Sequence, residues 1–338
     1  MDETPASIAD IVGMSVVSKD FYEVGREEVR TFARTVHDTS PLHVDEAAAH
    51  AAGHPALLAP LTFSAAMGGP MAQKDIIDSV PGNYSLSQML HVEQRHVFHQ
   101  PLYAGDRIWR VGCIDSFRPS DHADLFVIKT QFVRADGEVV QTVWVSLLAR
   151  SGGGGGGEVA DELETAARRV MMVTPGVPIA DSPGPTPDMV HDAVDARRFA
   201  ATDPAAAQWT AGQQLPTESF AVSRIDLAHY SGVAGDPNPI HFSEEIAQIA
   251  GLDTVVAQAM LTMGLGASYL GDRVGDPAAV REYRARFTSP VLVPAGELAT
   301  VDFGAKVKKV GDGQAELALT ATHRGKRVLG RCTAVVNI

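Results

Sequence analysis

The sequence predicts an α+β fold in which one structural unit, an antiparallel sheet wrapped around a buried helix, occurs twice. Three observations lead to this prediction: two sequence blocks recur in the same order, a long apolar segment precedes a series of alternating strands, and a glycine- and proline-rich segment separates two similar halves. The length of 338 residues exceeds what one ordinary core needs and suits two domains.

The recurring blocks indicate a duplicated domain. Residues 37–53 match residues 235–251 at a constant offset of 198, so that Asp38 and His43 correspond to Asp236 and His241. A later block, 95–101, matches 284–290. Because both blocks occur in the same order, a duplication explains them better than two chance similarities.

The composition changes sharply near the middle of the chain. Six glycines follow Ser151, and prolines then crowd at positions 175, 178, 183, 185 and 187, with one short helical candidate, Glu158–Met172, between them. No Gly-Lys-Ser/Thr follows the glycines, which excludes a phosphate-binding loop. We therefore expect a flexible linker at 151–211 between an N-terminal domain at 1–150 and a C-terminal domain at 212–338.

The helices are easier to predict in the second copy than in the first. A capping-box pattern at Ser223 predicts a short helix that ends near Tyr230. The prolines in 236–239 exclude a helix there, because a residue before proline is pushed to extended geometry. Ser243 then caps a second short helix that ends at Gly251.

A buried helix and four strands follow in the second copy. Residues 255–270 are nearly all apolar or small, which predicts one buried helix. Beyond them the hydrophobic period becomes two, as in antiparallel strands with one buried face. The alternating residues are Tyr283, Ala285 and Phe287, then Val301, Phe303, Ala305 and Val307, then Ala315, Leu317, Leu319 and Ala321, then Val328, Gly330, Cys332, Ala334 and Val336.

Charge and cysteine content exclude several classes of protein. The formal net charge of −13 argues against generic binding to nucleic acid or to an anionic membrane. Two cysteines, Cys113 and Cys332, cannot form a disulfide framework and suit a reducing cytosol. The N-terminus lacks a signal-peptide pattern and no uncharged stretch reads as a membrane span, so we expect a cytoplasmic globular protein.

One motif carries a specific resemblance. Residues 230–241 read YSGVAGDPNPIH, residues 257–264 read AQAMLTMG, and residues 59–63 of the first copy read APLTF. The chain resembles the MaoC-like (R)-specific enoyl-thioester hydratases, and its two halves resemble a fusion of the two subunits of the mycobacterial (3R)-hydroxyacyl-carrier-protein dehydratase. The resemblance implies a double hot-dog fold, in which two antiparallel sheets, each wrapped around a long central helix, pack as an intrachain pseudo-dimer.

The motif contains the groups that dehydration of a 3-hydroxyacyl thioester needs. The reaction requires a base for the α-proton, an acid for the departing hydroxyl and hydrogen-bond donors for the thioester oxygen. Asp236 and His241 supply the acid–base pair, whose division of labour stays open, and Gly235 and Asn238 support their loop. The resemblance implies that the main-chain N–H of Ala259 stabilises the oxyanion.

The first copy is ambiguous. Asp38 and His43 keep the motif spacing, but Ser40 replaces the expected asparagine. The resemblance implies a non-catalytic half that shapes the acyl channel, with Leu61 and Phe63 as channel residues. The alternative is a second active site at Asp38 and His43.

The leading functional hypothesis is therefore a hydro-lyase of fatty-acid metabolism that reversibly converts (3R)-hydroxyacyl thioesters to trans-2-enoyl thioesters. It needs no cofactor and no metal, and the substrate is carried by CoA or by acyl carrier protein. Acyl length and oligomeric state, a monomeric pseudo-dimer or a homodimer, stay open. The alternatives are a non-catalytic acyl-thioester-binding hot-dog protein, suggested by Gln258 and Ala259 where the family commonly has His-Gly, and a hot-dog thioesterase.

A pair of histidines and a group of basic residues each have a simpler alternative explanation. His91 and His96 are five residues apart in a strand-like region, so a zinc site there is not expected. Residues 281–338 contain ten Lys or Arg against five Asp or Glu. Six of them form either a basic rim for a substrate phosphate or the solvated face of long strands: Arg281, Arg284, Arg286, Lys306, Lys308 and Lys309.

Overall fold

The structure is a computed structural model that describes residues 8–18, 20–68, 84, 89–121, 123–149, 184–192, 199–236 and 238–338. The predicted helix Glu158–Met172 and the glycine run lie outside these residues, as does most of the predicted linker.

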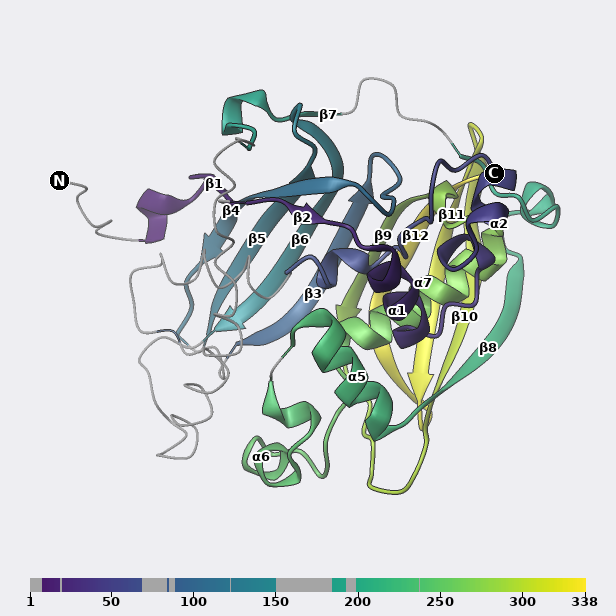
Figure 1. Ribbon diagram of the computed structural model, residues 1–338. Helices are drawn as coiled ribbons and strands as arrows, with labels where there is room; N and C mark the ends of the chain where they lie inside the picture. Colours follow the sequence, from purple (N-terminus) through teal and green to yellow (C-terminus); the bar gives the residue numbers. More distant parts are fainter. Residues whose placement is uncertain are drawn as a thin grey trace.

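Most of the described chain forms one large sheet (Figure 1). Its strands are β1 (Val16–Val17), β2 (Tyr22–Glu23), β3 (Leu90–Phe98), β4 (Arg107–Arg118), β5 (Asp124–Val133), β6 (Glu138–Ala149), β7 (His191–Asp192), β8 (Gln214–Val222), β9 (Val280–Phe287), β10 (Ala299–Gly311), β11 (Gln314–His323) and β12 (Lys326–Asn337). The strand order is β1-β4-β5-β6-β3-β9-β12-β11-β10-β8, with β2 paired to β4 and β7 paired to β6.

The described helices are short, with one exception. The α-helices are α1 (Arg26–Thr35), α2 (Glu46–Ala51), α5 (Arg224–Ala234), α6 (Glu244–Ile249) and α7 (Ala259–Val274). The 3-10 turns are η1 (Ile8–Ile11), η2 (Pro41–His43), η3 (Phe63–Ala65), η5 (Pro187–Met189), η6 (Ala206–Gln208), η7 (Pro239–His241) and η8 (Pro277–Ala279). No helix in the described part of the chain is long and apolar enough to cross a membrane.

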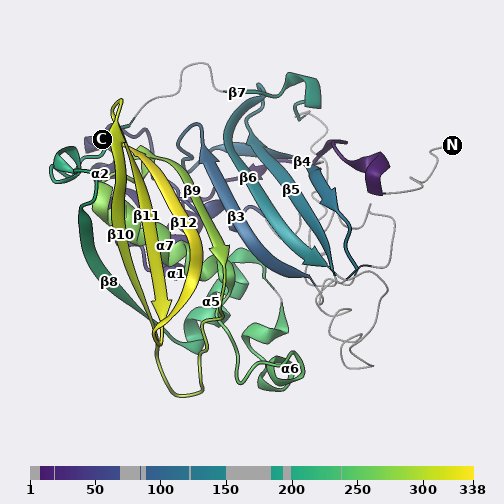
Figure 2. The ribbon, with the colours of Figure 1, turned by 180° about the vertical axis from the view of Figure 1, so that it is seen from behind.

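The two copies join at an antiparallel pairing of β3 with β9, which we call the seam. Arg95 lies opposite Arg284 in the register, and the guanidinium of Arg95 donates two hydrogen bonds, of 3.0 and 2.9 Å, to the carboxylate of Glu282. Figure 2 shows the strands of both copies continuing across this seam. The predicted double hot-dog, packed as an intrachain pseudo-dimer, is confirmed.

Helix α7 is the buried central helix, displaced by four residues from the predicted segment. Residues 255–257 are extended instead, because Val256 forms a bridge with Leu292 and the N–H of Ala257 donates to the carbonyl of Val291 at 2.9 Å. The helix ends at Val274, and Gly275 follows with a φ of 76°. The segment that follows β9 thus holds the extended turn into α7.

The same helix also packs against the first copy. The hydroxyl of Ser268 donates to the carbonyl of Val36 at 2.8 Å, and a Cβ placed on Gly264 would lie 2.6 Å from Val36 Cγ1. Helices α1, α5 and α7 lie on one face of the sheet (Figures 1 and 2), and the rings of Phe32 and Tyr230 from α1 and α5 are 6.3 Å apart. The central helix of the second copy is therefore part of the contact between the copies.

Candidate active site

The motif of the second copy places an aspartate and a histidine on one loop. Helix α5 ends at Ala234 and is capped by Gly235, whose φ of 65° turns the chain just before Asp236. Asp236 Oδ1 accepts from the N–H of Asn238 at 3.2 Å, and Asn238 Oδ1 accepts from the N–H of Ile240 at 3.3 Å. These bonds hold the loop so that His241 Nε2 lies 3.6 Å from Asp236 Oδ2. We call Asp236 and His241 the second dyad.

The protonation pattern of His241 follows from its other nitrogen. Nδ1 lies 2.8 Å from the carbonyl oxygen of Val256, which can only accept a hydrogen bond. The neutral ring therefore carries its proton on Nδ1 and presents the lone pair of Nε2 toward Asp236. A nitrogen in this state can take up a proton and later return it.

A helix N-terminus lies next in the chain after this contact. Ala259 is the first residue of α7, and the N–H groups of a first helical turn have no partner within their own helix. Both Ala259 and Met260 are half-buried, so this turn is not sealed in the core. The aspartate–histidine pair and the N-terminal backbone N–H groups of α7 are thus linked through one short segment, 256–259.

The first copy keeps the geometry of the pair. His43 Nε2 lies 3.2 Å from Asp38 Oδ2, His43 Nδ1 donates to the carbonyl of Leu58 at 2.6 Å, and the N–H of Ser40 donates to Asp38 Oδ1 at 3.0 Å. Each contact has its counterpart in the second copy at the sequence offset of 198. We call Asp38 and His43 the first dyad.

Burial separates the two dyads. The side chains of Asp38 and His43 are 5% and 0% exposed, whereas those of Asp236 and His241 are 27% and 8% exposed. Of the two aspartates, only Asp236 presents a substantial part of its carboxylate to a ligand from solvent. The described structure gives the second dyad access and leaves the first enclosed.

Enclosure also shifts the ionisation of the first dyad. Burial opposes the charge on Asp38, but the neighbouring His43 and the amide of Ser40 outweigh it and lower the pKa of Asp38 below its ordinary 3.8. Burial likewise opposes the charge on His43, but the charge and hydrogen bond of Asp38 raise the pKa of His43 above its ordinary 6.5. The two groups therefore stabilise one another as an ion pair.

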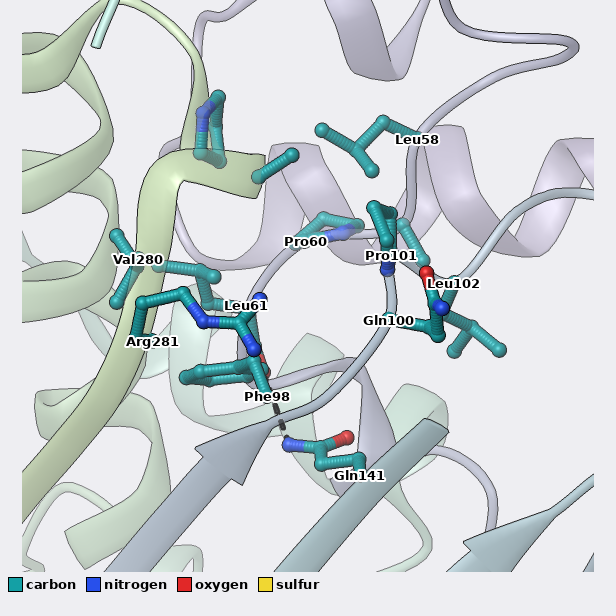
Figure 3. A pocket seen from close by; sticks show the side chains of 13 residues that line it. Leu58, Pro60, Leu61, Phe98, Gln100, Pro101, Leu102, Gln141, Val280 and Arg281 are labelled. Atoms are coloured by element: carbon teal, nitrogen blue, oxygen red, sulfur yellow. Dashed lines mark hydrogen bonds between the residues drawn. The ribbon is translucent and has the colours of Figure 1, made fainter. Parts of the chain in front are cut away.

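A small, partly open pocket lies between the copies (Figure 3). From the first copy it is lined by Leu58, Ala59, Pro60, Leu61, Phe98, Gln100, Pro101, Leu102 and Gln141, and from the second by Pro277, Ala278, Val280 and Arg281. Leu61 thus borders a pocket, whereas Phe63 is 1% exposed and packs against the rings of Phe32 and Tyr22 at 5.4 and 6.4 Å.

The six basic residues of the predicted rim do not gather in one place. Arg284 and Arg286 both pair with Glu93 across the seam. Arg281 donates to the carbonyl of His99 and borders the pocket. The three lysines lie on β10, which β12 and β11 separate from β9 in the sheet. Of the two alternatives, a basic rim and the solvated face of long strands, a single rim does not form, because the sheet order disperses charges that are close in sequence.

The histidines His91 and His96 lie on β3, and the ring of His91 packs against Phe287 of the second copy. Burial lowers the pKa of His91 to about 4 and that of His96 to about 3. His96 Nδ1 accepts from Gln141 Nε2 at 2.7 Å. Within the described ranges, no group of three or more histidine, cysteine, aspartate or glutamate side chains is arranged to hold a metal ion.

One residue near the second dyad has contacts that the sequence patterns did not indicate. Gln258, immediately before α7, donates from Nε2 to the carbonyl of Leu227 and to Ser231 Oγ, both at 2.9 Å. In the sequence, this residue stood out because Gln258 and Ala259 replace the His-Gly pair that is common in the family. That replacement does not indicate where an amide side chain will point.

Comparisons with known proteins agree with this architecture. The family model described as "FAS1-like, dehydratase domain region" matches residues 10–143, and the one described as "MaoC like domain" matches residues 206–324. A UPF0336 protein of Mycolicibacterium paratuberculosis is 34% identical over 163 residues, which cover 48% of this chain and 91% of that protein.

Solved structures extend the likeness to the whole chain. A structure titled "MaoC-like dehydratase" has a TM-score of 0.83 and 34% identity, and the match covers 97% of this chain and 98% of that one. A conserved hypothetical protein of Mycobacterium tuberculosis with a double hotdog fold has a TM-score of 0.59 and 15% identity, with 99% of each chain covered. The latter likeness concerns the fold alone.

Proposed function

This chain belongs to the MaoC-like dehydratase family and is a hydro-lyase, and from that premise we propose that it interconverts (3R)-hydroxyacyl thioesters and trans-2-enoyl thioesters by losing or adding water. The observation that carries the proposal is the accessible second dyad, linked through the carbonyl of Val256 to the start of α7.

The acid–base chemistry belongs to Asp236 and His241. One of them removes the α-proton and the other protonates the departing hydroxyl; in hydration the roles reverse. A separation of 3.6 Å between His241 Nε2 and Asp236 Oδ2 lets both atoms face one small reacting group.

The backbone N–H of Ala259 is the oxyanion donor in this proposal. The thioester oxygen gains negative charge as the α-proton leaves, and an N–H at a helix N-terminus stabilises such charge. Alanine keeps the donor that the glycine of related sequences would supply. Its half-buried position at the start of α7 supports this role.

The pocket between the copies is proposed to receive the far end of a long acyl chain. Helix α7 has 16 residues and is therefore about 24 Å long. Ala259 lies at its start, while Pro277 and Val280 of the pocket follow its end. A chain that starts at the second dyad and follows α7 would reach Leu61. The mainly apolar lining of the pocket suits such a group.

A substrate panel tests the proposed function. Crotonyl and longer trans-2-enoyl thioesters would be offered on CoA and on acyl carrier protein, with hydration and the chirality of the product measured. We expect (3R)-hydroxyacyl products, and a preference for one carrier would identify the physiological form of the substrate. Binding without turnover of any member, or cleavage of the thioester bond, would overturn the proposal in favour of a binding protein or a thioesterase.

A further inference from the structure

Gln258 occupies a capping position but does not cap its helix. It immediately precedes α7, with φ of −56° and ψ of 137°, and its side chain makes no hydrogen bond to the first turn. Side chains at this position commonly accept from the second or third N–H of the helix. Here the first-turn N–H groups, including that of Ala259, receive no side-chain cap.

The side chain of Gln258 reaches α5 instead. Its Nε2 donates to the carbonyl of Leu227 and to Ser231 Oγ, which lie one turn apart on that helix. Because a carbonyl only accepts, the Leu227 contact establishes which end of the amide is the NH₂ group. Gln258 is 1% exposed, and its Oε1 has no hydrogen-bond partner among the described residues. The side chain is thus held through its two N–H donors.

These two bonds join the two halves of the proposed catalytic machinery. Helix α5 ends two residues before Asp236, and Gln258 immediately precedes Ala259. The distance between the carboxylate and the backbone donor therefore depends on how α5 and the start of α7 are held together. The bond from His241 to Val256 provides a second connection to the same segment.

The duplication supplies an internal comparison. At the offset of 198, Phe32, Ala33 and Pro60 of the first copy stand where the second has Tyr230, Ser231 and Gln258. None of these three side chains can make the amide contacts, yet the first dyad keeps its own geometry. Geometry of the dyad therefore does not require the Gln258 contacts. The copy that has them is the one whose dyad is accessible.

We propose that Gln258 is a positioning residue that holds the oxyanion donor of Ala259 in place relative to Asp236 and His241. This role rests on the proposed hydratase function. It concerns the transition state, because the thioester oxygen gains negative charge only as the α-proton leaves. Loss of the two bonds should therefore reduce kcat far more than it changes KM.

The first test compares variants at and near Gln258 in the hydration of crotonyl-CoA. Gln258→Met preserves the size of the side chain and removes both donors, and Ser231→Ala removes one acceptor. We expect Gln258→Met to lower kcat roughly 10- to 100-fold, the effect of a misplaced reacting geometry. Ser231→Ala should cause a smaller loss in the same direction. Gln248→Ala, at an exposed glutamine of α6, is the matched control and should retain wild-type kinetics.

A spectroscopic test of the position of the Ala259 donor does not require turnover. In an Asp236→Asn background, a conjugated dienoyl-CoA would be bound and its absorption band recorded. Hydrogen bonding to the thioester oxygen polarises the conjugated system and moves the band to longer wavelength. We expect Gln258→Met in that background to bind the same probe with a smaller shift, which a loss of folded protein alone would not produce.

The outcomes separate this inference from the function on which it rests. A Gln258→Met protein with wild-type kcat, or with an unchanged shift for the bound probe, would overturn the positioning role. A wild-type protein that hydrates no enoyl thioester would overturn the proposed function instead, while the band shift would still decide whether Gln258 aligns the donor.

Discussion

At the scale of single residues, two dyads with the same hydrogen bonds have different surroundings. His43 and His241 each donate from Nδ1 to a carbonyl 15 residues further along the chain. The spacing of the motif was enough to predict that each aspartate and histidine would meet. Their exposure was not predictable, because it depends on α7 packing over the first copy, a contact between residues more than 200 positions apart.

The enclosed first dyad should contribute to stability. Asp38→Asn should lower the free energy of unfolding by roughly 3 kcal/mol near pH 5, because it leaves His43 without its buried charge partner. Asp236→Asn is the matched control, and its loss should be smaller because that side chain is 27% exposed. Denaturant titrations of the three proteins measure the difference.

The pH dependence of this effect has a definite sign. The lowered pKa of Asp38 gives stability that is present above pH 3.8 and is lost as the pH falls through the folded-state value. The raised pKa of His43 gives stability that is present below pH 6.5 and is lost as the pH rises through its folded-state value. The difference between wild type and Asp38→Asn should be greatest between these two limits. A difference that grows steadily above pH 7 would contradict the ion pair.

Leu61 and Phe63 should now behave differently, although the sequence suggested the same role for both. Leu61→Trp would fill part of the pocket and should lower kcat/KM for long enoyl thioesters by about tenfold or more relative to crotonyl-CoA. Phe63→Ala should lower the free energy of unfolding by about 3–5 kcal/mol without changing that ratio, since Phe63 packs in the core. Equal ratios for Leu61→Trp and wild type would remove the pocket from the acyl path.

At the scale of elements, α7 was predicted as one buried helix, and its type and burial are confirmed. Its predicted boundaries lie four residues too early, because apolar content alone does not distinguish a helix from the extended turn that precedes it. The isolated bridge from Val256 to Leu292 uses a partner 36 residues away, which local periodicity does not reveal.

Glycines on the described helices should respond differently to the same substitution. Gly264→Ala places a Cβ 2.6 Å from Cγ1 of Val36, which is itself 1% exposed, and should lower the free energy of unfolding by about 1 kcal/mol or more. Gly232→Ala on α5 meets no atom within 4 Å and should raise it by up to about 1 kcal/mol. Thermal melts of both variants test this prediction. A stabilised Gly264→Ala protein would show that α7 is not closely packed against Val36 of the first copy.

At the scale of the whole molecule, the seam and α7 unite two similar halves whose dyads differ in exposure. The duplication and the pseudo-dimer were predictable from repeats, since two copies of a dimer-forming unit in one chain can pair with each other. The pairing of Arg95 with Glu282 was not predictable, because the sequence does not specify which strands meet at the seam. For the same reason the sequence did not decide between a basic rim and the solvated face of long strands.

The central claim is that the second dyad performs the reaction and the first is structural. Turnover of crotonyl-CoA by Asp236→Asn, His241→Gln, Asp38→Asn and His43→Gln, each corrected for its folded fraction, tests this most directly. We predict that the first two variants lose roughly a hundredfold or more in kcat and that the last two retain most of it. A loss of about half the turnover in Asp38→Asn or His43→Gln, with stability unchanged, would instead show two working sites and contradict the account.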